Sequence, residues 1–186
     1  MEENNERFMF KDSAYALPPW RIDEIEVLAM ETLKTGGYFD YGFDYRKMIT
    51  DTGIRIKKFS SFKPENLAEF SRASLSLWND GVCLVIPRTE ECGPKKMIAY
   101  NDTLSDAQVM YILLHEFAHI LLKHTQQSIN GESEAACFAV AMKILIEIRS
   151  AFLSEMEKVL FGRTLRDFPS KMRHLKKASA YKKEVI

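Results

Sequence analysis

Residues 114–120 read Leu-His-Glu-Phe-Ala-His-Ile, inside an apolar stretch. Two histidines four positions apart, His115 and His119, stand on one face of a helix, one turn from each other. Both imidazoles can therefore reach a single Zn²⁺ at about 2.0–2.1 Å. Glu116 lies one position from His115, where its carboxylate can reach water on the metal without binding the ion itself. This HExxH arrangement predicts His115 and His119 as metal ligands and Glu116 as a catalytic base.

A bare HExxH can arise by chance, so the residues around it decide between a metal site and two ordinary histidines. Residues 105–108, Ser-Asp-Ala-Gln, have the form of a capping box and predict a helix from there to about Lys123. A helix this apolar is expected to be buried. Burying two histidines and a glutamate is costly unless they are paired or bound to metal. The context therefore favours the metal site.

The third ligand would define the subclass of the site. Leu122 and Thr125 stand where HExxHxxGxxH needs Gly and His, so a third histidine is excluded. The stretch GESEAACFAVA opens a second long helix, expected from about 132 to near 160, and offers Glu132 and Glu134. These lie about 200° apart around a helix, so only one can face the metal.

We predict Glu134 as the third ligand, because the small residues at 135–136 allow close approach to the HExxH helix. Glu132 is the second candidate; its place in the first turn is better explained by the helix dipole. His124 falls about 140° around the helix from His119. We interpret it as a residue that suits the C-terminal end of the helix dipole.

The rest of the chain predicts a single α+β domain over residues 1–186. A helix is expected at about 20–35, and strands at 54–59, 73–78, 82–86 and 96–100, with a hairpin turn at Asn79-Asp80-Gly81. The expected fold is a small, mainly antiparallel sheet of three or four strands. It would pack on a helical zincin-like core formed by the HExxH helix and the Glu-bearing helix that follows. Residues 1–17 are expected to be flexible, and 163–186 to form a basic helical extension.

The composition and the sequence pattern argue against several classes of protein. Lys+Arg and Asp+Glu both number 26, a balance that argues against nucleic acid as a partner. No apolar stretch reaches membrane-spanning length, and the start MEENNERFMFKDS lacks the pattern of a signal peptide. The three cysteines, Cys83, Cys92 and Cys137, are odd in number and form no CxxC. They are expected to be free thiols in a cytoplasmic protein with no membrane partner.

Taken together, these residues resemble the ImmA/IrrE family of zinc metallopeptidases, over about residues 20–145. The resemblance rests on a strand ending at Asn101, the HEFAH helix and a downstream acidic segment: Ile98-Ala99-Tyr100-Asn101, 115–119, Leu121-Leu122, His124, Glu134-Ala135 and Phe138-Ala139. Three departures are visible. Ala118 replaces a usual glycine, Ala136 stands where Asn or Asp is common, and the family's proline is absent from 139–146.

The resemblance implies a gluzincin-type site with Zn²⁺ as cofactor. It also implies a protein substrate, often a helix-turn-helix transcriptional repressor encoded nearby. We expect the strand ending at Tyr100 to edge the cleft and to pair with an extended substrate, which makes Tyr100 a candidate substrate-binding residue. The alternative is a metal-containing regulatory module that docks a repressor without cleaving it. Glu116 favours the enzyme, since a purely structural site needs no base. The sequence leaves the oligomeric state open.

Overall fold

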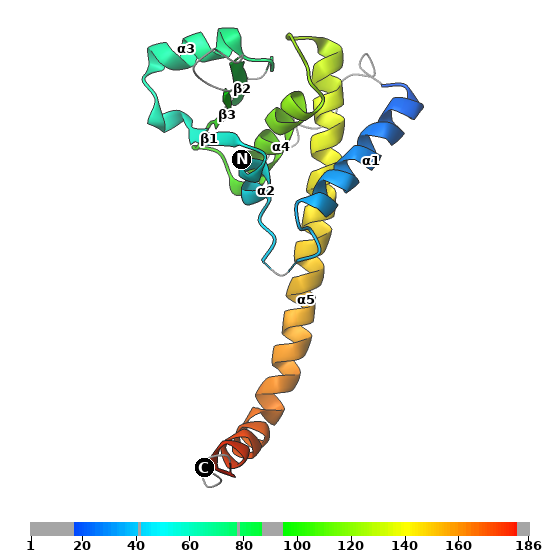
Figure 1. The fold of residues 1–186 in the computed structure, drawn as a ribbon, viewed down its shortest axis with the longest axis vertical. Helices are drawn as coiled ribbons and strands as arrows, with labels where there is room; N and C mark the ends of the chain where they lie inside the picture. The colour runs from blue at the N-terminus through cyan, green and yellow to red at the C-terminus, as the bar shows by residue number, and fades with distance from the viewer. Residues whose placement is uncertain (1–16, 41, 78, 87–94, 182–186) are drawn as a thin grey trace, which may run out of the picture. The chain divides into compact units, whose positions relative to one another are not determined.

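A computed structural model of the chain describes residues 17–40, 42–77, 79–86 and 95–181, with the backbone alone beyond residue 157. Within these ranges the fold is α+β, as predicted, with five α-helices and one three-stranded sheet. The chain divides into two units, residues 1–144 and 145–186. Figure 1 follows the elements along the chain. The expectation of a single domain stays a prediction.

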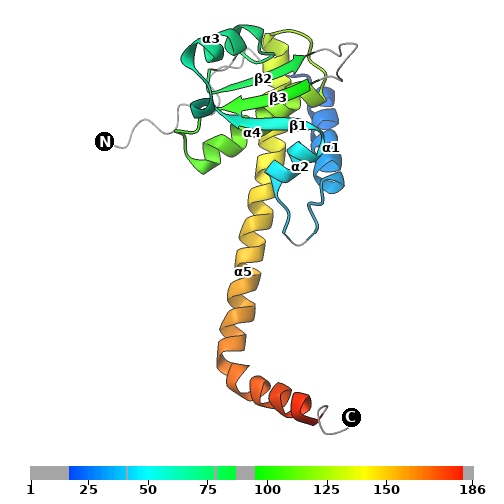
Figure 2. The same ribbon diagram turned by 60° about the vertical axis from the view of Figure 1, so that its left-hand side comes forward.

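The sheet consists of β1 (Ile54–Lys58), β2 (Gly81–Ile86) and β3 (Lys95–Tyr100), in the order β1-β3-β2. β3 is the middle strand, as Figure 2 shows. It runs parallel to β1 and antiparallel to β2. The sheet is therefore mixed, where the sequence predicted a mainly antiparallel one.

The predicted hairpin around Asn79-Asp80-Gly81 does not form. Of its first expected strand, 73–78, the described residues are instead the end of helix α3 (Pro64–Ala73) and an irregular segment at 74–77, and residue 78 lies outside the described residues. That segment still follows the outer edge of β2. The Ser74 hydroxyl oxygen accepts the Cys83 N–H at 3.1 Å, and the Leu75 N–H donates to the Cys83 carbonyl at 3.1 Å. β2 finds its strand partner in β3, and the turn signal alone could not reveal this distant pairing.

The helices of the first unit begin with α1 (Pro19–Thr35) and the short α2 (Tyr45–Asp51), both close to expectation. Helix α4 (Asp106–Leu121) carries the HExxH residues and packs against β2 and β3. Its predicted capping box is present: Gln108 Oε1 accepts the Ser105 backbone N–H at 3.1 Å and its hydroxyl at 2.7 Å. The cap marks where α4 begins.

Helix α5 (Ile129–Tyr181) begins three residues earlier and ends later than the sequence predicted. Its first turns belong to the unit of residues 1–144, whose core joins α1, the sheet, α4 and the start of α5. Fully buried members of this core include Leu33, Ile98, Phe117 and Phe138. The unit of residues 145–186 contains the remainder of α5. None of the described helices is long and apolar enough to cross a membrane.

Candidate metal centre

His115 and His119 lie one turn apart on the buried face of α4, as their spacing predicts. Both are completely buried, at 0% exposed. Their Nε2 atoms approach each other to 3.2 Å. Two ring nitrogens aimed at the same point from one helix form half of a tetrahedral metal site.

Glu132, in the first turn of α5, completes the cluster. Its Oε2 lies 2.9 Å from Nε2 of His115, and its Oε1 lies 3.5 Å from Nε2 of His119. The Leu77 N–H donates to Oε1 at 2.6 Å and fixes the carboxylate from the β2 side. Potential ligand atoms of His115, His119 and Glu132 all lie within 4.8 Å of one another, and no other such group occurs among the described residues.

Glu134 lies elsewhere, so the structure places the two glutamates the opposite way round from the prediction. Arg21 on α1 donates to both Glu134 oxygens, from Nε at 2.9 Å and from Nη2 at 3.0 Å. His124 Nε2 lies 3.1 Å from Glu134 Oε2. The physical reason is the face of α5 that packs in the core, which Ala135, Ala139 and Met142 define. Glu132, three positions before Ala135, lies near that face, and Glu134 is about 200° away from Glu132.

Glu116 is also buried, at 1% exposed, and neither of its carboxylate oxygens has a well-formed hydrogen bond. The Ser76 hydroxyl and the Cys83 thiol are its polar neighbours. Gly81 of β2 allows this carboxylate to lie where it does. A Cβ at Gly81 would come within 2.7 Å of Glu116 Oε1 and 2.6 Å of Ile112 Cγ2.

The family model for the IrrE N-terminal-like domain, Peptidase_M78, matches residues 52–149, more than half of the chain. The chain belongs to the Peptidase_M78 family. A comparison with curated proteins finds no match, and neither does one with solved structures. The matched range of Peptidase_M78 includes β1 to β3, α4 and the start of α5, and leaves α1 with Arg21 outside it. Membership supports proteolysis as the class of activity.

The electrostatics of Glu132, Glu116 and His115 differ. Burial alone would raise the pKa of Glu132, but hydrogen bonds with His115, His119 and the Leu77 N–H outweigh it and lower that pKa to about 2. Glu116 has weaker partners, so desolvation dominates and raises its pKa to about 8. Burial lowers the pKa of His115, which favours the neutral, ligating imidazole.

These residues fit a metal ion of the kind Peptidase_M78 implies. Two imidazoles and one ionised carboxylate are a donor set that suits zinc. Glu116 supplies a second indication, because burying a carboxylate without a well-formed hydrogen bond is costly. A cation and a water molecule beside it would remove that cost.

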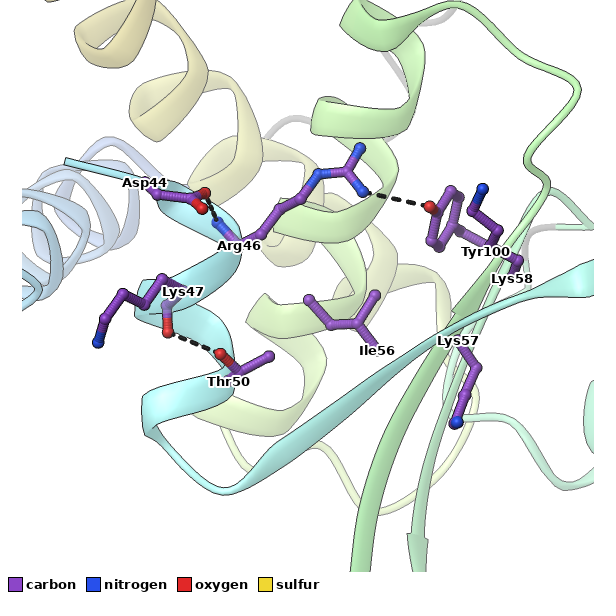
Figure 3. Close-up of a pocket in the computed structure, with 8 residues that line it drawn as sticks. All are labelled: Asp44, Arg46, Lys47, Thr50, Ile56, Lys57, Lys58 and Tyr100. Atoms are coloured by element: carbon purple, nitrogen blue, oxygen red, sulfur yellow. Dashed lines mark hydrogen bonds between the residues drawn. The ribbon is translucent and has the colours of Figure 1, made fainter. Parts of the chain in front are cut away.

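Tyr100 does not lie where the sequence placed it. β3 is paired on both sides, so it cannot edge a cleft and accept a substrate strand. The Tyr100 side chain is 4% exposed, and its hydroxyl accepts a hydrogen bond from Arg46 Nη1 at 3.2 Å. Tyr100 lines a separate basic pocket, drawn in Figure 3, whose lining includes none of His115, His119 and Glu132. The pocket is lined by Asp44, Arg46, Lys47, Thr50, Ile56, Lys57, Lys58 and Tyr100.

Two residues beside the cluster, His124 and Arg21, have no predicted role at the site from sequence alone. His124 was interpreted as a helix-end residue, yet its Nδ1 lies 2.9 Å from Nδ1 of His119. Arg21 was not singled out at all, and it lies 113 positions from Glu134. The HExxHxxxxH spacing could have suggested His124. No local pattern could have suggested Arg21. Of the predicted free cysteines, Cys83 and Cys137 are free, and Cys92 lies outside the described residues.

Proposed function

We propose that this chain is a zinc-dependent endopeptidase in which His115, His119 and Glu132 hold the metal and Glu116 is the base. One observation carries the proposal. Two histidine Nε2 atoms and a carboxylate converge within 4.8 Å next to a buried glutamate without a well-formed hydrogen bond. A purely structural zinc site is closed by four protein ligands and needs no such base. Membership in Peptidase_M78 supports the same class of reaction.

Each residue has a distinct part in the reaction. A zinc ion held by His115, His119 and Glu132 would supply Lewis-acid chemistry for the scissile carbonyl and the attacking water. Glu116 accepts a proton from the attacking water and returns it to the leaving amine. A cation nearby favours the charged form of Glu116 and so prepares it to accept that proton. Glu132, held by Leu77, keeps its carboxylate aimed at the two imidazoles.

The proposed substrate is a protein, a transcriptional repressor encoded close to this chain, and the proposed location is the cytoplasm. The support is the resemblance to ImmA/IrrE peptidases that the residues of the HExxH helix and the following helix carry. We propose one or a few cleavage sites in this regulator rather than general degradation.

The test combines zinc analysis with a cleavage assay. The purified wild-type protein and Glu116→Gln are compared for bound zinc and for cleavage of the repressor encoded next to this chain. Glu69→Gln is the matched control, because Glu69 is an exposed glutamate on α3. The proposal expects one zinc per chain in all three proteins and cleavage by all except Glu116→Gln. Zinc without cleavage by any of them, together with stable binding of the repressor, would instead support a docking module.

A further inference from the structure

A continuous line of polar contacts runs outward from His119 to the surface of α1. His119 Nδ1 lies 2.9 Å from His124 Nδ1, and His124 Nε2 lies 3.1 Å from Glu134 Oε2. Arg21 closes the line with two hydrogen bonds to Glu134, at 2.9 and 3.0 Å. The side chains become gradually more exposed along it, from 0% for His119 through 12% for His124 and 19% for Glu134 to 28% for Arg21.

With a neutral His124, the chemistry of these groups permits one consistent order of protons. The Arg21 guanidinium can only donate, and the Glu134 carboxylate beside it can only accept. His124 must therefore donate from Nε2 to Glu134. In a neutral imidazole the other nitrogen is then an acceptor, so His124 Nδ1 accepts from His119.

This order determines the tautomer of His119. Its Nδ1 carries the proton, which leaves the lone pair on Nε2, the atom that faces His115 and Glu132. The opposite tautomer would put a proton on Nε2 and block coordination. Arg21 matters because its charge already balances Glu134, so His124 need not carry a second proton for that purpose.

We propose that Arg21, Glu134 and His124 are positioning residues that hold His119 in the tautomer and orientation that a metal ligand needs. The inference rests on the proposed function, since it takes His119 as a zinc ligand. It makes α1 part of the functional site, although Arg21 lies outside the matched range 52–149. Outer-shell partners of ligating histidines typically change metal affinity by about 10–100-fold when they are lost.

The first measurement does not involve metal. Long-range ¹H–¹⁵N correlation spectra of the metal-free wild type should show His119 as a single tautomer protonated on Nδ1. Arg21→Met keeps roughly the length of the side chain but removes the guanidinium group that binds Glu134. His124→Phe keeps an aromatic ring but removes the Nδ1 atom that accepts from His119. Both variants should give a mixed or reversed His119 tautomer. Arg55→Met, on an exposed β1 position, is the matched control and should keep the wild-type pattern.

The second measurement is zinc affinity, by competition with a chromophoric chelator. Arg21→Met and His124→Phe should each weaken zinc binding about 10–100-fold. Arg21→Lys keeps the charge without the bidentate geometry and should lie between Arg21→Met and wild type. Far-ultraviolet circular dichroism and melting temperature check that each variant is folded, and a variant that fails this check is replaced by the other.

The outcomes separate this inference from the proposed function. An unchanged His119 tautomer in folded Arg21→Met and His124→Phe, with zinc affinity within about twofold of wild type, overturns the positioning role. If the His119 tautomer changes in Arg21→Met but the wild type binds no zinc, the result supports the positioning role of Arg21 and contradicts the proposed zinc peptidase.

Discussion

Two glutamates at the start of α5, two residues apart, have opposite surroundings. Glu132 meets the Nε2 atoms of His115 and His119, whereas Glu134 meets the guanidinium of Arg21 and the ring of His124. The pKa of each carboxyl is lowered, for Glu134 chiefly by Arg21 and for Glu132 by its histidine partners against the effect of burial. Charge at neutral pH therefore does not distinguish them. Their partners do, because a carboxylate held by a bidentate arginine is already paired and a carboxylate between two imidazoles can serve a metal.

The largest effect should come from removing one glutamate at a time. Glu132→Ala takes away a ligand and should weaken zinc binding by more than the ~100-fold that an outer partner can cost. Glu134→Ala removes only an outer partner and should cost about 10–100-fold at most. Chelator competition on the two variants gives both values. Greater loss in Glu134→Ala than in Glu132→Ala would reverse the comparison and restore Glu134 as the ligand.

A third carboxylate sharpens the contrast, since Glu116 is proposed to move protons rather than to hold either metal or arginine. Glu116→Gln should lower the rate of peptide cleavage by about 10²–10⁴-fold, because a proton acceptor is lost. Zinc affinity should stay within a few-fold of wild type. The measurement is initial cleavage rate with fully zinc-loaded protein. Loss of zinc in this variant would mean that Glu116 is itself a ligand.

Gly81→Ala tests the space that β2 leaves for Glu116. The added Cβ would meet Glu116 Oε1 at 2.7 Å and Ile112 Cγ2 at 2.6 Å, so overpacking should cost about 1–3 kcal/mol of stability. It should also slow cleavage per folded molecule, by displacing the base. Chemical denaturation and activity assays measure the two effects.

Gly42→Ala provides the control for Gly81→Ala. Gly42 has φ +83° and open space around it, so alanine there is strained without touching the site. It should lose about 1–2 kcal/mol of stability through backbone strain. Its cleavage rate per folded molecule should be that of wild type. Equal losses of activity in the two variants would show that instability alone explains the effect of Gly81→Ala.

The smallest effect is expected from the cap of α4, which supports both histidines and touches neither glutamate. Ser105→Ala should lower the free energy of unfolding by about 0.5–2 kcal/mol, because the capping box with Gln108 is broken. The zinc affinity of the folded Ser105→Ala protein should equal that of wild type. Urea denaturation and chelator competition check the two statements. A cap variant that loses zinc while still folded would show that the register of α4 depends on this one residue.

The part of the site that the sequence predicted is the part that a single helix determines. His115, Glu116 and His119 lie within five residues, so helical spacing alone sets their relative positions, and the capping box marks the start of the same helix. The α+β class also followed from local periodicity. These features need no knowledge of distant contacts.

The features that were missed depend on distant contacts. Spacing gives the angle between Glu132 and Glu134 but not which of them faces α4, since that depends on which face of α5 packs in the core and on the pairing of Glu134 with Arg21. Similarly, the turn signal before β2 could not show that β3 would lie between β1 and β2. For the same reason Tyr100 fell on the central strand, where it cannot bind a substrate strand.

The most direct test of the zinc site is a crystal structure of the zinc-loaded protein with anomalous scattering measured at the zinc absorption edge. The account predicts one peak at about 2.0–2.2 Å from Nε2 of His115, Nε2 of His119 and a carboxylate oxygen of Glu132. Glu134 should remain on Arg21. A peak coordinated by Glu134 in place of Glu132, or no peak beside the two histidines, would contradict it.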